Sequence, residues 1–217
     1  MADSTLSIGI PGQVKKLVDC GDGTLAERVV AGGRTPRLTA TYTRAADATQ
    51  YQAGDLIGNT TTSANVVPIT WDVGSNGSGR VTGCRVVVAA ASGTVVLTNL
   101  AVDLYLFRPA TNIPFAAGSY PADNAAINLT AAAHRELLGI FSFPNAGWRN
   151  QVGANSAAGA FLNQEAAVNG VYGRPYAPFN FSGLSATTIR GLMVAQAAWN
   201  PGNVAQQFDF ALDVDLD

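Results

Sequence analysis

Residues 94–109, TVVLTNLAVDLYLFRP, carry the pattern that decides the fold. From residue 99 onward the side chains form two alternating sets: Leu100, Val102, Leu104 and Leu106 in one, and Asn99, Ala101, Asp103, Tyr105 and Phe107 in the other. A period of two over eight residues predicts a strand with one face buried in a core and the other face toward a wetter surface. Pro109 ends the strand because proline has no N–H to donate to a sheet.

Other segments show the same alternation or the same richness in β-branched residues, which predicts further strands. These segments are residues 38–43, 66–71, 80–91, 140–143, 187–199 (where a helix stays open as the alternative) and 208–217. One helix is expected in residues 131–138, with Thr130 as its N-cap and Gly139 at its end. Leu137 and Leu138 of that helix are expected to close one end of the sheet pair.

Three features predict how the strands pair. Residues 80–91 and 94–107 are separated only by Ser92-Gly93, so we expect them to form a hairpin. Pro68 places its strand at the edge of a sheet. The last strand, 208–217, alternates apolar residues with aspartates. We expect these aspartates to aid solubility and protect an edge, with a metal site or a catalytic dyad as the alternative.

The helices that would connect parallel strands are missing from this pattern. We therefore expect an all-β fold: an antiparallel β-sandwich, jelly-roll-like, with one short helix and an N-terminal arm. The arm is residues 1–35, where short apolar segments flank the turn DCGDG at residues 19–23 and predict a hairpin. The sandwich domain is residues 36–217.

The composition excludes several function classes. Only 13% of the 217 residues are charged and the formal net charge is −2, so no field attracts nucleic acid or an acidic membrane. Little repulsion keeps copies apart, which favours self-association. No apolar stretch of about 18 residues predicts a membrane span. The N-terminus lacks the features of a secretory signal. We therefore expect a cytosol-like compartment, with Cys20 and Cys84 as free thiols.

We find no catalytic, cofactor-binding or metal-binding motif in the sequence. His134 is the only histidine, and no Gly-x-Ser-x-Gly elbow occurs to form a hydrolase triad. One histidine and two distant cysteines do not make a zinc site, and the acids around residues 19–27 lack the spacing of a calcium loop. A carboxylate pair for glycoside hydrolysis stays open, although Asp55, Asp103 and Glu165 have no distinguishing context. We expect a protein that is not an enzyme.

Residues 144–185 are rich in Asn, Gly, Ala and Pro but keep several aromatic side chains. Spaced aromatics in a segment of low charge are typical of a contact surface. The candidate contact residues are Trp148, Phe161, Tyr172, Tyr176 and Phe179. The alternative, that these side chains cover one end of the core, stays open.

Several phrases occur together between residues 15 and 143. They are DCGDGT at 19–24, TRAADATQYQAGDLI at 43–57 and LYLFRP at 104–109, followed by DNAA at 123–126 and a short helix before Leu138-Gly139. Together they resemble a group of small virion proteins of tailed bacteriophages, which are typically head-associated β-sandwich proteins. The resemblance carries over no catalytic residue.

This resemblance implies a capsid decoration or cement protein. Such a protein would be made in the host cytoplasm, bind the major capsid protein on the outer surface of the head, and associate with itself as a dimer or trimer. The arm, residues 1–35, would reach the shell or a neighbouring copy. The runner-up is a tail- or fibre-associated module that recognises carbohydrate, because jelly rolls also serve lectins and Trp148, Tyr172 or Tyr176 could stack on sugars. A hydrolase is the third interpretation.

Overall fold

The computed structural model describes residues 5–7, 14–19, 25–28, 36–60, 65–74, 78–90, 99–108, 113, 120–145, 148–150, 157–162, 179–181 and 188–216. The chain divides into two compact units, residues 1–33 and 34–217. Strands dominate both units, so the all-β prediction is confirmed.

The first unit is a small antiparallel sheet of β1 (Thr5–Ser7), β2 (Val14–Asp19) and β3 (Leu25–Arg28), with β2 in the middle. Val18 pairs with Ala26 and Asp19 with Leu25. The strands of the hairpin expected around DCGDG are therefore present, while the turn residues 20–24 lie outside the described residues.

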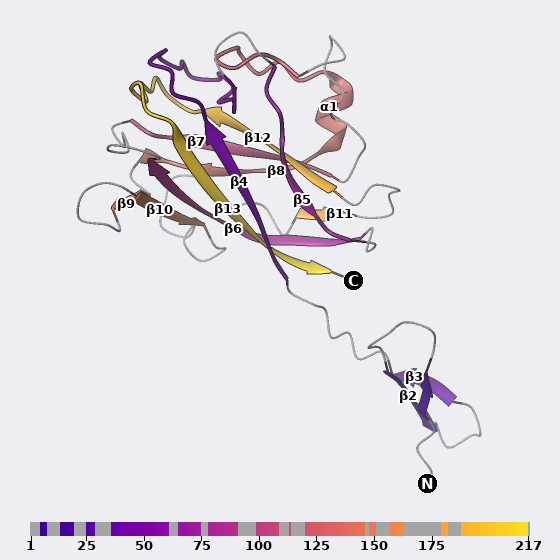
Figure 1. Ribbon diagram of the computed structural model, residues 1–217. Coiled ribbons are helices and arrows are strands. Elements are labelled where there is room, and N and C mark those ends of the chain that lie inside the picture. The colour runs from indigo at the N-terminus through magenta and orange to yellow at the C-terminus, as the bar shows by residue number, and fades with distance from the viewer. Residues whose placement is uncertain are drawn as a thin grey trace. The chain divides into compact units, whose positions relative to one another are not determined.

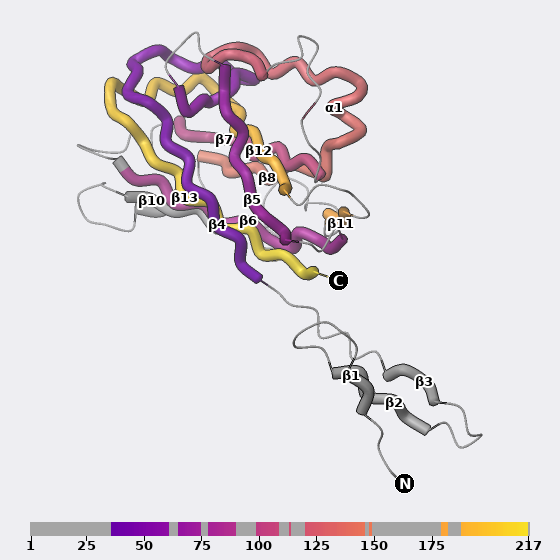
Figure 2. The backbone as a smooth tube through the Cα atoms, turned by 45° about the vertical axis from the view of Figure 1, so that its right-hand side comes forward, coloured from indigo at the N-terminus to yellow at the C-terminus, as the bar shows by residue number. Residues whose placement is uncertain are grey.

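The second unit consists of two antiparallel sheets (Figure 1). The six-stranded sheet has the order β4 (Arg37–Arg44), β13 (Gln206–Leu216), β6 (Gly79–Ala90), β10 (Ala157–Leu162) and β9 (Arg149–Asn150), and β11 (Phe179–Phe181) also pairs with β6. The four-stranded sheet has the order β5 (Ile69–Asp72), β12 (Thr188–Ala195), β7 (Val102–Phe107) and β8 (Leu137–Phe143). Figure 1 and Figure 2 both show β4 and β13 side by side, although they come from the two ends of this unit.

The main core lies between the two sheets. Leu100, Val102, Leu104 and Leu106 have no exposed surface, as their alternation predicted. Phe208, Phe210, Leu212 and Val214 of β13 face them from the other sheet, each at most 1% exposed. Burial of one such side chain stabilises the fold by roughly 1.5–3 kcal/mol. The sandwich expected from the two alternating strands is confirmed.

A second layer covers the outer face of the four-stranded sheet. Phe107, expected on the wetter face of its strand, is 1% exposed, and Ala101 is also buried. The neighbours of Phe107 come from β12 and from the chain before β5 and before β8; the cluster is Leu56, Val66, Phe107, Ile113, Ala133, Leu192 and Val194. This part of the prediction is wrong because an alternating pattern does not reveal a layer that the loops add.

The hairpin expected between residues 80–91 and 94–107 is also wrong. β6 lies between β13 on one side and β10 and β11 on the other, and β7 lies between β12 and β8. β6 and β7 therefore belong to different sheets. The buried faces of β6 and β7 meet across the core between the two sheets, and the two strands do not pair edge to edge.

The helix α1 (Ala131–Glu136) begins as predicted and ends earlier. Thr130 caps it by accepting a 3.0 Å hydrogen bond from the Ala133 amide. Leu137 already starts β8 and packs against the second layer, whereas Leu138 packs against the main core. Gly139 lies inside β8, where a Cβ would stand 2.2 Å from the Phe179 ring. Gly139 is therefore a site of close packing and not a helix stop.

The predictions for the remaining strands are mixed. β5 is an edge strand, as Pro68 indicated, and residues 188–195 form a strand and not a helix. The closing strand β13 forms with the expected alternation. However, it lies between β4 and β6 and protects no edge.

Candidate functional site

The outer face of the six-stranded sheet is open along β4 and β13. On β4, Thr39, Thr41 and Thr43 are exposed. On the neighbouring β13, every second residue from Gln207 to Asp215 is partly exposed. Because sheet side chains alternate between faces, these residues all lie on one side of the sheet.

A row of aspartates on β13 lies between rows of partners on the two adjacent strands. The strand register places Thr41 opposite Asp209 and Arg37 opposite Asp213. The same register, on the β6 side, places Arg80 opposite Asp215. Cross-strand neighbours of opposite charge attract one another. The aspartates of β13 therefore have side-chain partners on both neighbouring strands, β4 and β6.

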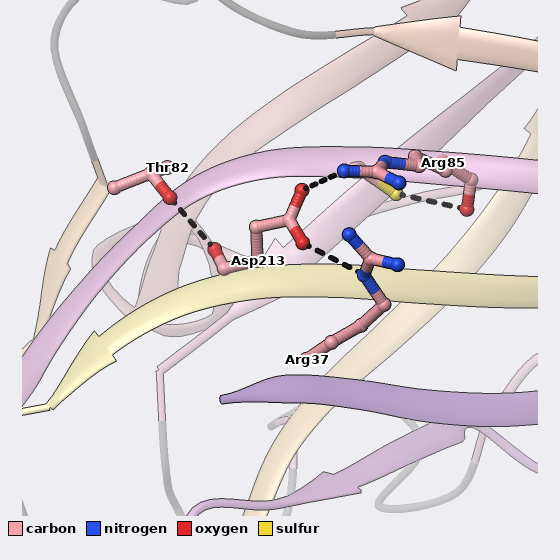
Figure 3. Close-up of polar contacts among 5 residues, drawn as sticks. Arg37, Thr82, Arg85 and Asp213 are labelled. Carbon is pink, nitrogen blue, oxygen red and sulfur yellow. Dashed lines mark hydrogen bonds and ion pairs between the residues drawn. The ribbon is translucent and has the colours of Figure 1, made fainter. Parts of the chain in front are cut away.

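Asp213 is the centre of this row (Figure 3). Arg37 Nε donates to its Oδ1 at 3.0 Å, and Arg85 Nη2 donates to its Oδ2 at 3.2 Å. Figure 3 shows the two guanidinium groups approaching the carboxylate from β4 and β6. The Thr82 hydroxyl donates to the Asp213 carbonyl at 3.1 Å. One carboxylate thus serves two cations.

The other aspartates of the row are also paired. Arg80 Nε lies 2.7 Å from Asp215 Oδ2, and the Thr41 hydroxyl donates to Asp209 at 2.7 Å. Exposed ion pairs of this kind contribute about 0–1 kcal/mol each. Within the described residues, no group of three or more His, Cys, Asp and Glu side chains could hold a metal ion. The paired aspartates therefore add little to stability, and their main effect is to set the pattern of charges on this face.

A second polar cluster is buried at one end of the sandwich and consists of Arg44, Tyr51 and Asp123. Arg44 Nε donates to the Tyr51 hydroxyl at 3.1 Å, and that hydroxyl donates to Asp123 Oδ1 at 2.9 Å. Asp123 also accepts from the Gly58 amide at 2.5 Å. The Arg44 guanidinium lies over the rings of Tyr51 and Trp199. The cluster joins three loops to the end of β4.

Burial controls the protonation of this cluster. It raises the pKa of Asp123, an effect that the hydrogen bonds from Gly58 and Tyr51 and the Arg44 charge partly oppose. Burial also raises the pKa of Tyr51, so its hydroxyl keeps the proton that it donates. Arg44 and Tyr51 are each 1% exposed and Asp123 is 4% exposed. The cluster is therefore closed to a substrate and holds the loops in place.

Two of the five candidate contact residues lie in the core. Trp148 is buried with its ring 6.3 Å from that of Phe143, and Phe179 is buried with its ring 5.1 Å from that of Phe141. For Trp148 and Phe179 the alternative, that they cover the core, is correct, because each aromatic ring has a partner ring from the sheets.

The side chains of the other three candidate contact residues lie outside the described part of the chain. Phe161 occupies the register position opposite Arg85, and its side chain lies outside the described residues. Tyr172 and Tyr176 lie outside them entirely.

The candidate chemical groups do not converge in the described part of the chain. Asp103 accepts hydrogen bonds from Ser142 and Gln196, both at 2.6 Å. Asp55 accepts from the Gln52 amide at 2.6 Å. His134 is exposed on α1, and Glu165 lies outside the described residues.

Of the two cysteines, Cys84 lies among the described residues and Cys20 does not. Cys84 is a free thiol, fully buried, and burial raises its pKa. A thiol in that state is a poor nucleophile. Cys20 lies outside the described residues.

Sequence reasoning missed the buried cluster, although one signal was present. Leu38, Ala40 and Tyr42 form the inward set of β4, and Arg44 continues that set. An arginine at an inward position requires buried partners. The identity of those partners, Tyr51 and Asp123, was not readable because they come from separate loops.

Comparison with known proteins identifies no relative: no family model, no curated protein and no solved structure matches this chain. No helix in the described residues is long and apolar enough to cross a membrane. The function must therefore be inferred from the open outer face of the six-stranded sheet, where arginines and aspartates are paired.

Proposed function

We propose that this protein is a structural virion protein, a capsid decoration or cement protein that binds the outer surface of a phage head. It would stabilise contacts between subunits of the major capsid protein. The open face of the six-stranded sheet is the observation that carries the proposal. The phage assignment rests on the phrases between residues 15 and 143 that resemble head-associated proteins.

We also infer that the sandwich is of jelly-roll type. Four strand pairs support this inference: β4 with β13, β5 with β12, β6 with β10, and β7 with β8. Among these eight strands the first pairs with the last, the second with the seventh, and so on inward. A chain that folds back at its midpoint and then rolls up produces this order. Jelly rolls occur in viral capsid proteins and in lectins.

The open face has the properties of a docking surface between proteins that fold independently. It carries exposed arginines beside β13, and arginine is enriched at interfaces between proteins. Its backing is a close-packed core, so it would meet a partner with little loss of conformational freedom. A stable contact buries roughly 1,200–2,000 Å² in total. Self-association as a dimer or trimer, and contacts made by residues 1–33, would add to that area.

Quantitative mass spectrometry of purified particles tests the proposal. Copy numbers in the hundreds per particle are expected for decoration of a shell. A few copies would instead support the tail- or fibre-associated carbohydrate-binding alternative, and absence from the particles would refute a virion role. For that alternative, Trp148 is excluded as a stacking residue because it is buried.

A further inference from the structure

We propose that Arg37 and Arg85, held on either side of Asp213, bind a carboxylate-rich surface on the protein that docks against the six-stranded sheet. This inference rests on the proposed function, since it identifies the chemistry of the partner at the same face. It starts from the sharing of one carboxylate by two guanidinium groups.

Arg37 and Arg85 carry hydrogen-bond donors that Asp213 does not use. A guanidinium group carries five N–H donors. Arg37 uses Nε for Asp213, and Arg85 uses one terminal nitrogen. No further acceptor for either group is found among the described residues. Donors on two neighbouring guanidinium groups therefore stay available to a partner.

The arginine side chains are more exposed than the carboxylates that they pair with. The side chains of Arg37 and Arg85 are 52% and 39% exposed, and that of Asp213 is 25% exposed. The Arg80 side chain is likewise more exposed than that of its partner Asp215, at 53% and 27%. A partner approaching the sheet therefore meets guanidinium groups before carboxylates. Because Asp213 already orients two of the arginines, less conformational freedom is lost on binding.

The charge balance around Asp213 favours an anionic partner. Two arginines, Arg37 and Arg85, share the single carboxylate of Asp213, which leaves one positive charge in excess at this point of the face, while Arg80 and Asp215 balance each other. Guanidinium groups match carboxylates in a two-pronged geometry. A phosphate backbone would also match in geometry, but its charge density is much higher than that of an acidic protein surface, so the net charge of −2 on the chain opposes it more strongly. An acidic protein surface is the better fit.

The test uses a labelled hexaglutamate peptide as the probe, with hexalysine and a short DNA duplex for comparison. Binding is measured by fluorescence anisotropy at low and at high salt. We expect the full-length protein to bind hexaglutamate, and high salt to weaken the binding. The double variant Arg37→Gln/Arg85→Gln should lose about tenfold or more in affinity. Arg135→Gln, at an exposed position on α1, is the single-charge control and should bind like the unmodified protein.

Two further variants keep the proposal falsifiable. Arg37→Lys/Arg85→Lys retains the charge but not the two-pronged geometry, so it should bind more weakly than the unmodified protein and more tightly than the glutamine variant. The single variant Arg85→Gln substitutes if the double variant does not fold by circular dichroism. Equal binding by all variants, or a preference for the DNA duplex, would overturn the proposal.

Particle occupancy separates this proposal from the proposed function. If the unmodified protein is absent from purified particles, the virion role fails. If it is present and the variant Arg37→Gln/Arg85→Gln occupies particles equally well, the virion role stands and the inference about carboxylates fails. Reduced occupancy of that variant, with normal occupancy of Arg135→Gln, is the expected result.

Discussion

The outer faces of the two sheets differ in what lies on them. The four-stranded sheet carries Phe107 and Leu192 outward under a second apolar layer. The six-stranded sheet carries threonines and paired charges outward, with Thr39 and Thr41 exposed. The covered face therefore contributes to stability, and the open face is the one available for contacts. Substitutions on each face should separate these roles.

The largest effect is expected on the covered face. Phe107→Ala would leave a cavity in the second layer and lower the free energy of unfolding by about 3–5 kcal/mol. Thr43→Ala, on the open face, should change it by no more than about 0.5 kcal/mol. Urea denaturation followed by circular dichroism measures both. Equal effects of the two substitutions would remove the distinction between the faces.

A smaller effect is expected from the buried carboxylate. Asp123→Asn should lower the free energy of unfolding at neutral pH by about 1–3 kcal/mol, because an NH2 group replaces one of the two oxygens that accept from the buried Tyr51 hydroxyl. Urea titrations of the variant and the unmodified protein at one pH give the difference. An unchanged midpoint would show that the network adds nothing to stability.

The pH dependence of that difference has a definite sign. Burial raises the pKa of Asp123 above its ordinary value of 3.8, so the folded state binds this proton more tightly than the unfolded state does. The contribution of Asp123 to stability is therefore fully present below about pH 3.8 and decreases as pH rises through the raised pKa. Relative to Asp123→Asn, the unmodified protein should lose stability over that window. A relative gain with rising pH would contradict the burial of this carboxyl group.

The smallest effect is expected from the exposed carboxylate. Asp213→Asn removes the anion between Arg37 and Arg85, but these side chains are well solvated. We expect a loss below about 1 kcal/mol, and less at high salt. Urea titrations at two salt concentrations measure it. A loss as large as that of Asp123→Asn would mean that the open face, too, is a stabilising element.

The sequence predicted which residues face a core more reliably than it predicted which strands pair. The set from Leu100 to Leu106 is buried as expected, because alternation follows directly from strand geometry. The expected hairpin of residues 80–91 with 94–107 was wrong, because alternation contains no information about distant partners. The start of α1 was readable from Thr130, whose hydroxyl caps locally. Its end was not, because Gly139 is required by the ring of Phe179 from a distant strand.

The candidate site was less predictable than the fold. Trp148 and Phe179 belong to a segment whose composition is typical of a contact surface, but tertiary packing places both side chains in the core. The aspartates of β13 were visible in the sequence, whereas their arginine partners depend on a register that joins both ends of the domain. Arg44 was the one residue whose inward position signalled buried partners. Local patterns therefore identify faces, and long-range pairing decides which of them stays open.

Particle occupancy of two matched variants tests the central claim most directly. Thr39→Arg adds a bulky side chain to the open face, and Thr70→Arg makes the same change at an exposed position of β5 on the other sheet. Quantitative mass spectrometry of particles assembled with each variant should find reduced occupancy for Thr39→Arg and normal occupancy for Thr70→Arg. Normal occupancy for Thr39→Arg, with a loss for Thr70→Arg, would show that the protein docks through the other sheet.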